Sequence, residues 1–346
     1  MNRVYTYRSR RGAVNFQIER RTLRFIGGLS LLAALVCIAG TGLGHTSIPP
    51  WEVLATMLGI GSGEHDFVVL TLRLPRVLTA LLVGAALGIS GTILQGLIRN
   101  PLASPDIVGI TGGASAAAVA FLTYAAGTVS LQWLPAAAIA GALLVSLLIY
   151  ALSWQGGVTP IRLVLVGIGL SAAASAVTTM MIVRSPMVSA GEAYIWLTGS
   201  VYGASWQDVH TVWPVVAAGL PLALAFARSL NAQELGDEVA GGLGVAIQPH
   251  RAALLLISVV LAGFAVSVAG AVGFVGLLAP HLARRLVGRP LGGQLVVAGL
   301  LGGLIVFAAD LIARTAFYPL DVPAGVFTAG VGAPFFLYLL FRGRNR

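Results

Sequence analysis

The side chains able to do acid–base, metal or nucleophilic chemistry are few and scattered in this sequence. The chain has twelve Asp and Glu residues, five His and one Cys. The histidines show no HExxH or comparable ligand spacing, and no Ser/His/Asp order stands out. Cys37 lies inside an apolar run, where a thiol is usually buried and inert. We therefore predict that the chain is not an enzyme and that it holds no metal or cofactor.

Every basic residue is an arginine, since the 21 Lys and Arg residues include no lysine. A Walker A loop needs a lysine to contact the phosphates of ATP. The sequence therefore excludes an ordinary P-loop in this chain.

A few charged residues flank apolar runs, where ionisable groups near membrane depth are functional by default. Arg73 and Arg76 lie at the start of the apolar run 74–97. Asp310 and Arg314 are four residues apart, so on a helix they share a face and could form an ion pair at its end. No buried acid resembles a proton or sodium relay, which argues against an ion-coupled secondary transporter.

The tripeptide "SPD" at residues 104–106 has the features of a helix start. Ser104 would cap the helix, Pro105 would take its first position, and Asp106 would face the positive end of the helix dipole. This role is structural and needs no transport chemistry.

Residues 230–250, "LNAQELGDEVAGGLGVAIQPH", form the longest polar interval on the expected cytoplasmic side. The interval contains Glu234, Asp237 and Glu238, and several glycines divide it into short pieces. One interpretation is a solvated loop. The other is a pair of short helices that dock on a partner protein, which the acids favour because they interrupt an arginine-rich face.

Residues 270–290 place Pro280 and His281 inside a short apolar run that ends in three arginines. The proline would kink or start a helix, and the arginines would anchor it at the inner membrane interface. We expect His281 to be packed and hydrogen-bonded rather than to ligate a metal.

The composition shows which elements must position these residues. The chain is 57% hydrophobic and 10% charged, with a mean hydropathy of +0.91, whereas soluble domains carry roughly 25% charged residues. We predict an all-α polytopic membrane protein in which residues 25–342 form a single domain. Its ten expected spans are 25–44, 74–97, 106–126, 132–153, 160–183, 209–228, 251–271, 274–287, 293–316 and 323–341.

The arginines predict the orientation of these spans. Ten spans put both termini on one side, together with 17 of the 21 arginines; the other four are Arg73, Arg76, Arg184 and Arg314. This asymmetry predicts that both termini are cytoplasmic. Residues 1–24 and 343–346 would be cytoplasmic tails. The first tail is arginine-rich, but its position before a span favours a topology signal over nucleic-acid binding, and the run 25–44 is a retained span rather than a cleaved signal peptide.

Forty-four glycines contribute many small-xxx-small patterns, such as Gly84 with Gly88 and Gly299 with Gly303. Such spacing allows helix backbones to approach closely in a membrane. We predict ordinary tight packing of the bundle at these positions.

Several of these segments together resemble one family. The stretches "RLPR…GAALGISGTILQGLIRNPLASPDIVGITGGA", "LGDEVAGGLG", "GFVGLLAPHLARRLVG" and "AADLIAR…VPAGVFTAGVGAPFFLYLL" resemble, in the same order, the FecCD-type permeases. These are the membrane subunits of ABC importers for iron-siderophores, haem and cobalamin. The resemblance covers about residues 68–342 and includes the motif residues Asn100, Pro101, Pro105, Asp106, Pro280, His281 and Asp310.

The resemblance implies a type II ABC importer permease of ten spans in the bacterial inner membrane. It implies a dimer with a second copy or a paralogue, two cytoplasmic ATPase subunits that use ATP and Mg²⁺, and a periplasmic binding protein. The expected cargo is an iron(III)-siderophore moved by alternating access, with haem or cobalamin as alternatives. A structural or assembly protein of the membrane is a further alternative, which would not need the segment 230–250.

The resemblance also assigns residues to partners. Arg73, Arg76 and Arg314 would face the periplasm and bind glutamates of the binding protein, since arginine grips a carboxylate through two hydrogen bonds. The segment 234–244 would enter a groove of the ATPase; its expected contacts are Glu234, Leu235, Gly236, Asp237, Glu238 and Gly244. Two positions depart from the family pattern. Asp321 replaces a usual glutamate, and the stretch after Gly288 is less basic than usual.

Overall fold

A computed structural model describes residues 4–8, 15–44, 46–61, 63–125, 127–317 and 320–343. Parts of the predicted cytoplasmic tails, at 1–3, 9–14 and 344–346, therefore lie outside the described residues, as does His45. Within these ranges, each of the ten predicted spans corresponds to a helix or to a pair of consecutive helices.

The spans are built by these helices: α1 (Arg20–Gly42), α3 (Leu74–Ile98), α4 (Pro105–Val108) with α5 (Ile110–Tyr124), α6 (Leu134–Leu152), α7 (Pro160–Arg184), α9 (Trp206–Glu234), α11 (Ile247–Ala269), α12 (Val275–Val287), α13 (Leu291–Ala316) and α14 (Ala324–Gly343). Among the described residues, seven helices are long and apolar enough to cross a membrane, and α5 and α14 are shorter apolar helices. The predicted polytopic helical fold is confirmed.

Several further elements are present. Two short helices, α2 (Pro50–Met57) and α8 (Met187–Thr198), were not expected, and a third, α10 (Asp237–Gly242), lies in the segment 230–250, where short helices were one of the two interpretations. The 3₁₀ helix η2 (Leu131–Trp133) runs into α6. A π-helix, η1 (Phe67–Arg73), runs directly into α3. The arginine-rich tail contains an antiparallel hairpin of β1 (Val4–Arg8) and β2 (Asn15–Glu19), so the all-α prediction holds for the bundle and not for the tail.

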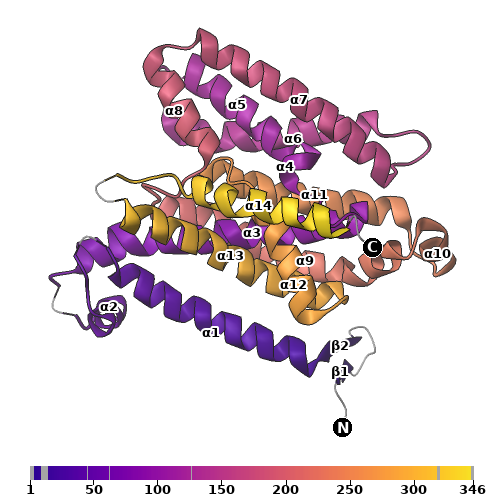
Figure 1. Ribbon diagram of the computed structural model, residues 1–346, viewed down its shortest axis with the longest axis horizontal. Coiled ribbons are helices and arrows are strands. Elements are labelled where there is room, and N and C mark those ends of the chain that lie inside the picture. The colour runs from indigo at the N-terminus through magenta and orange to yellow at the C-terminus, as the bar shows by residue number, and fades with distance from the viewer. Residues whose placement is uncertain are drawn as a thin grey trace.

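The helices form one bundle with two distinct ends. Figure 1 shows β1, β2, the C-terminal end of α14 and α10 toward the right end of the bundle, and α2 and α8 toward the left end. This arrangement agrees with the prediction that both termini lie on one side together with the segment 230–250. We call the end with α10 the inner end and the opposite end the outer end.

The centre of the bundle is α3, because small residues let neighbouring helices approach its backbone. In the most apolar stretch of this helix, 78% of the residues are buried inside the bundle, whereas the corresponding share in α7 is 17%. A Cβ on Gly84 would overlap the backbone of Gly302 in α13, and one on Gly91 would overlap the backbone of Gly276 in α12. The predicted tight packing is confirmed here. On the α11 side, the hydroxyl groups of Ser90 and Ser258 lie 2.8 Å apart and share a hydrogen bond.

Two of the predicted spans are irregular. The span expected at 106–126 is interrupted at Gly109, whose φ of 95° favours glycine and separates α4 from α5. A helix does start at Pro105, as predicted, but the Ser104 side chain makes no capping hydrogen bond. Pro280 lies inside the short helix α12, which begins after Phe274 at a φ of 65°.

Candidate functional site

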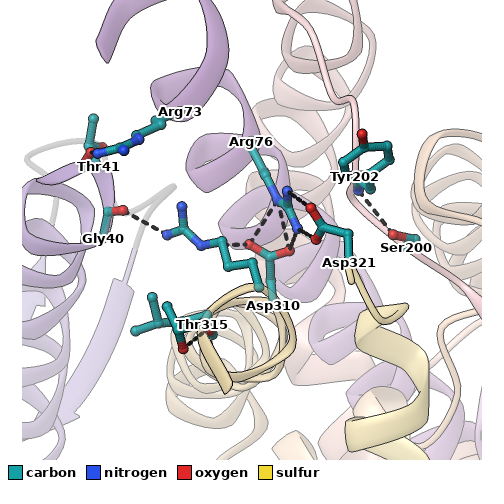
Figure 2. Close-up of polar contacts among 11 residues, drawn as sticks. Gly40, Thr41, Arg73, Arg76, Ser200, Tyr202, Asp310, Thr315 and Asp321 are labelled. Atoms are coloured by element: carbon teal, nitrogen blue, oxygen red, sulfur yellow. Dashed lines mark hydrogen bonds and ion pairs between the residues drawn. The ribbon is translucent and has the colours of Figure 1, made fainter. Parts of the chain in front are cut away.

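The first candidate site is a charged cluster at the outer end, formed by Arg76, Asp310, Asp321 and Arg314. Arg76 Nε and Nη2 donate to Asp310 Oδ1 at 2.9 and 2.8 Å, and Nη2 donates to Asp321 Oδ1 at 2.6 Å (Figure 2). The side chains of Arg76 and Asp310 are 12% and 1% exposed, whereas that of Asp321 is 32% exposed. One guanidinium group thus joins the start of α3 to α13 and to the α13–α14 connection.

The ion pair predicted within α13 is present but is not the main contact of Asp310. Arg314 Nε lies 3.7 Å from Asp310 Oδ2, whereas Arg76 approaches the same carboxylate to 2.8 Å. Helical spacing correctly identified one partner of Asp310. The closer partner is 234 residues away in the sequence and had no local signal.

Arg73 and Arg314 hold the end of α1. The last carbonyl groups of a helix have no partners within it and need other donors. Arg314 Nη2 donates to Gly40 O at 2.7 Å, and Arg73 Nη1 donates to Thr41 O and Gly42 O at 3.2 and 3.0 Å. Arg73 Nη2 also donates to Thr46 O at 2.8 Å. Cationic side chains at a helix C-terminus also interact favourably with the helix dipole.

The structure thus brings Arg73, Arg76 and Arg314 to one end of the bundle and gives each of them partners within the chain. Their expected contacts with glutamates of a binding protein stay a prediction. The geometry adds two contacts that sequence reasoning missed. Asp321 bonds the Arg76 guanidinium, and the ring of Tyr202 lies 5.4 Å from the Arg76 guanidinium carbon.

The second candidate site surrounds α10 at the inner end. Only one short helix forms among the described residues of the segment 230–250, so the prediction of a pair was wrong. The reason is that α9 continues to Glu234 and α11 already begins at Ile247. Gly236 and Gly244, with φ of 120° and 80°, isolate α10 from both long helices.

Asp237, the first residue of α10, is bonded to the bundle. Arg251 Nη2 donates to Asp237 Oδ1 and Oδ2 at 2.9 and 3.1 Å, and Arg99 Nη2 donates to Oδ1. Burial would raise the pKa of Asp237, but hydrogen bonds and charges from Arg251 and Arg99 outweigh it and lower the pKa. Because the folded-state pKa is lowered, this contact stabilises the fold above the ordinary carboxyl pKa and is lost as the pH falls through the folded-state value.

The exposed surface on and around α10 is largely apolar. Val239 in α10 and Leu243 at its end are 49% and 67% exposed, and Leu235, the C-cap residue of α9 before Gly236, is 68% exposed; Glu238 is also exposed. At the end of α9, Glu234 lies 3.5 Å from Arg284 of α12. Of the three acids predicted to meet a partner, Glu238 is exposed, while Asp237 and Glu234 form ion pairs with arginines of this chain.

Comparison with known protein families identifies the kind of protein that carries these two sites. A model of the FecCD transport family matches residues 31–342, which include both sites. The chain belongs to the FecCD transport family.

Relatives of this FecCD protein are similar over nearly its whole length. The achromobactin transport system permease protein CbrC of Dickeya dadantii is 49% identical over 338 residues, covering 97% of this chain and 96% of that protein. The probable siderophore transport system permease protein YfhA of Bacillus subtilis is 48% identical over 321 residues, covering 91% and 93%. A solved structure of a metal-chelate type ABC transporter in an inward-facing conformation has a TM-score of 0.83 and 28% identity, covering 92% of this chain and 99% of that chain.

The predicted function class is therefore confirmed. This FecCD protein is a multi-pass permease subunit of an ABC importer, a transporter subunit rather than an enzyme. Its family implies ATPase and binding-protein partners, as the sequence resemblance predicted.

The remaining motif residues of this FecCD protein have structural contacts. Asn100 Oδ1 accepts from the backbone N–H of Leu102 at 2.9 Å, which fixes the turn that contains Pro101. Thr111 Oγ1 donates to Asp106 at 2.8 Å and ties α4 to α5. The His281 ring packs edge-on against Phe335 with the ring centroids 5.4 Å apart, which agrees with the packed role expected for it.

Proposed function

We propose that this permease imports an iron(III)-siderophore across the bacterial inner membrane. The observation that carries the cargo is the 48% identity, over 91% of this chain and 93% of the relative, to a permease named for siderophore transport. Relatives named for iron(3+)-hydroxamate and ferric enterobactin support an iron(III) chelate as the cargo. The inner-membrane location follows from the family's role as an ABC importer permease and from the arginine asymmetry between the two ends.

In this proposal, the permease works as a dimer, either with a second copy or with a paralogue. Two ATPase subunits bind at the inner end and hydrolyse ATP with Mg²⁺, because this chain has no lysine for a P-loop of its own. The exposed apolar face of α10 would seat in the ATPase. A periplasmic binding protein delivers the cargo at the outer end, and alternating access moves it between the two sides.

The proposed function predicts ATP-dependent uptake by a reconstituted importer. Proteoliposomes containing this permease with its ATPase subunits and its binding protein should accumulate ⁵⁵Fe-siderophore only with internal Mg-ATP. Haem and cobalamin are offered in parallel at the same concentration. Uptake without the ATPase subunit would contradict the ABC mechanism, whereas ATP-dependent uptake of only haem or cobalamin would replace the siderophore as cargo.

We also propose that a carboxylate of the binding protein competes with Asp321 for Arg76. Asp321 is the more exposed of the two acids on this guanidinium, while the buried Asp310 keeps it charged and oriented. Asp321→Asn should therefore tighten docking of the binding protein by about 1.4- to fivefold, since a partly exposed ion pair contributes about 0.2–1 kcal/mol. Surface plasmon resonance with the permease in nanodiscs measures this affinity.

The matched control for Asp321→Asn is Glu64→Gln, which removes an exposed carboxylate from the same end of the bundle. An unchanged affinity in Asp321→Asn, equal to that of the control, would show that Arg76 does not dock the binding protein.

A further inference from the structure

We propose that Asp237, Arg251 and Arg99 form a coupling triad that transmits movement of α10 to the core of the permease. In this role Asp237 positions α10 on the bundle and does not itself contact the ATPase. The inference rests on the proposed function, in which the ATPase binds α10, and it identifies the residues that carry the force from that contact inward.

The centre of the triad is Arg251, which is completely buried and is the largest fully buried side chain of the described residues. Its guanidinium group donates to Asp237 through Nη2 and to Val158 O through Nη1. The charge of Arg251 is paired with Asp237 and both of its Nη atoms donate, while its buried Nε makes no hydrogen bond to the described residues. Arg251 therefore fastens α10 both to α11 and to the connection between α6 and α7.

A second contact strengthens the connection between α11 and residue 158. Gln248 Oε1 accepts from Val158 N at 3.0 Å, and its Nε2 donates to Val158 O at 3.4 Å. Gln248 thus bonds both backbone groups of one residue, one turn before Arg251 on α11. The α6–α7 connection is held to α11 at this point and should follow its movement.

The third member, Arg99, connects α10 to the centre of the bundle. Arg99 ends α3 at a φ of 56°, a left-handed conformation in which the backbone leaves the helix, and its side chain bonds Asp237. Arg76 lies near the other end of α3. The rise per residue of an α-helix puts it about 35 Å from Arg99. One densely packed helix therefore joins the coupling triad to the outer charged cluster.

The flanking glycines make the triad necessary for transmission. Gly236 and Gly244 both have positive φ, and a Cβ added to either would meet no atom within 4 Å. Without the ion pairs of Asp237, α10 would be attached through these open turns, its buried Ala240 and its packing against α9 and α11. A push on the exposed Val239 and Leu243 would then move α10 without moving α3 or α11.

The test separates docking from transmission in the complete importer. Asp237→Asn is expected to retain the ATPase subunit during purification and to keep ATP hydrolysis, while the cargo transported per ATP falls by about tenfold. Arg251→Lys should lower the cargo transported per ATP to a value between those of the wild type and Asp237→Asn. One ammonium group cannot reproduce the planar fork that bonds both Asp237 and Val158. If the two residues act as one unit, combining both changes should cost little more than the larger single change.

The matched controls are Glu19→Gln and Arg228→Lys, which make the same chemical changes at exposed positions of the inner end. Both should keep the wild-type ratio of transport to hydrolysis. A normal ratio in Asp237→Asn would overturn the triad, as would loss of the ATPase subunit from that variant, because Asp237 would then be a docking residue. Failure of the wild-type importer to use ATP at all would instead contradict the proposed function.

Discussion

Replacing Asp310 by alanine should destabilise the folded permease by about 3–5 kcal/mol, the usual cost of breaking a buried ion pair. Asp310 is 1% exposed and faces two arginines that are themselves 12% and 8% exposed. Its removal would leave Arg314 without a carboxylate at 3.7 Å and Arg76 with only the outer acid, Asp321. The measurement is the free energy of unfolding in mixed micelles, followed by tryptophan fluorescence during an SDS titration.

The control for Asp310→Ala is Glu192→Ala, which removes an exposed carboxylate from α8 at the outer end. A surface change of this kind should alter stability by less than about 0.5 kcal/mol. The double variant Asp310→Ala with Arg76→Leu should recover part of the loss, because an apolar replacement no longer leaves a buried charge. Equal stabilities of Asp310→Ala and Glu192→Ala would show that the outer cluster does not hold α3 to α13.

The positions of the spans were predictable from the sequence because the membrane dictates them. Every backbone group in the apolar core must be bonded within its own segment, so long apolar runs become helices. The break at Gly109 was not predictable in this way. The apolar character continues across it, and glycine is also common inside membrane helices, so only the φ of 95° reveals the division into α4 and α5.

Only some of the residues that form the two charged sites could be identified from the sequence. Arg73, Arg76 and Arg314 were identified because they are basic residues on the side with few arginines. Their partners were not, because Arg76 meets acids that are 234 and 245 residues away, a distance over which helical periodicity carries no information. From the sequence, Asp321 was only a departure from the family pattern. The structure shows that its carboxylate accepts a hydrogen bond from Arg76.

Arg251 shows the same limit at the inner end. In the sequence it was one of seventeen arginines on the cytoplasmic side, where such residues normally lie at the surface. In the structure it is fully buried. Its burial depends on a carboxylate from α10 and a carbonyl group from the α6–α7 connection, which only the folded chain brings together.

The close approach of α3 and α13 yields the second large expected effect. Gly84→Ala should destabilise the permease by about 1–3 kcal/mol, the usual cost of overpacking a dense core. The added Cβ would overlap the carbonyl group of Gly302, with Gly303 Cα 2.7 Å away. These are backbone atoms, which cannot rotate aside as a flexible side chain could, so the two helices have to separate. SDS titration measures this loss as well.

Gly169→Ala on α7 makes the identical change where no atom lies within 4 Å of the added Cβ. It should leave stability unchanged or raise it by up to about 1 kcal/mol, since alanine favours a helix more than glycine does. The opposite signs of the two variants separate close packing from helix propensity, because propensity alone would stabilise both. Since α3 also carries Arg76 and Arg99, separating it from α13 should weaken the outer cluster too, so combining Gly84→Ala with Asp310→Ala should destabilise less than the two single losses added together.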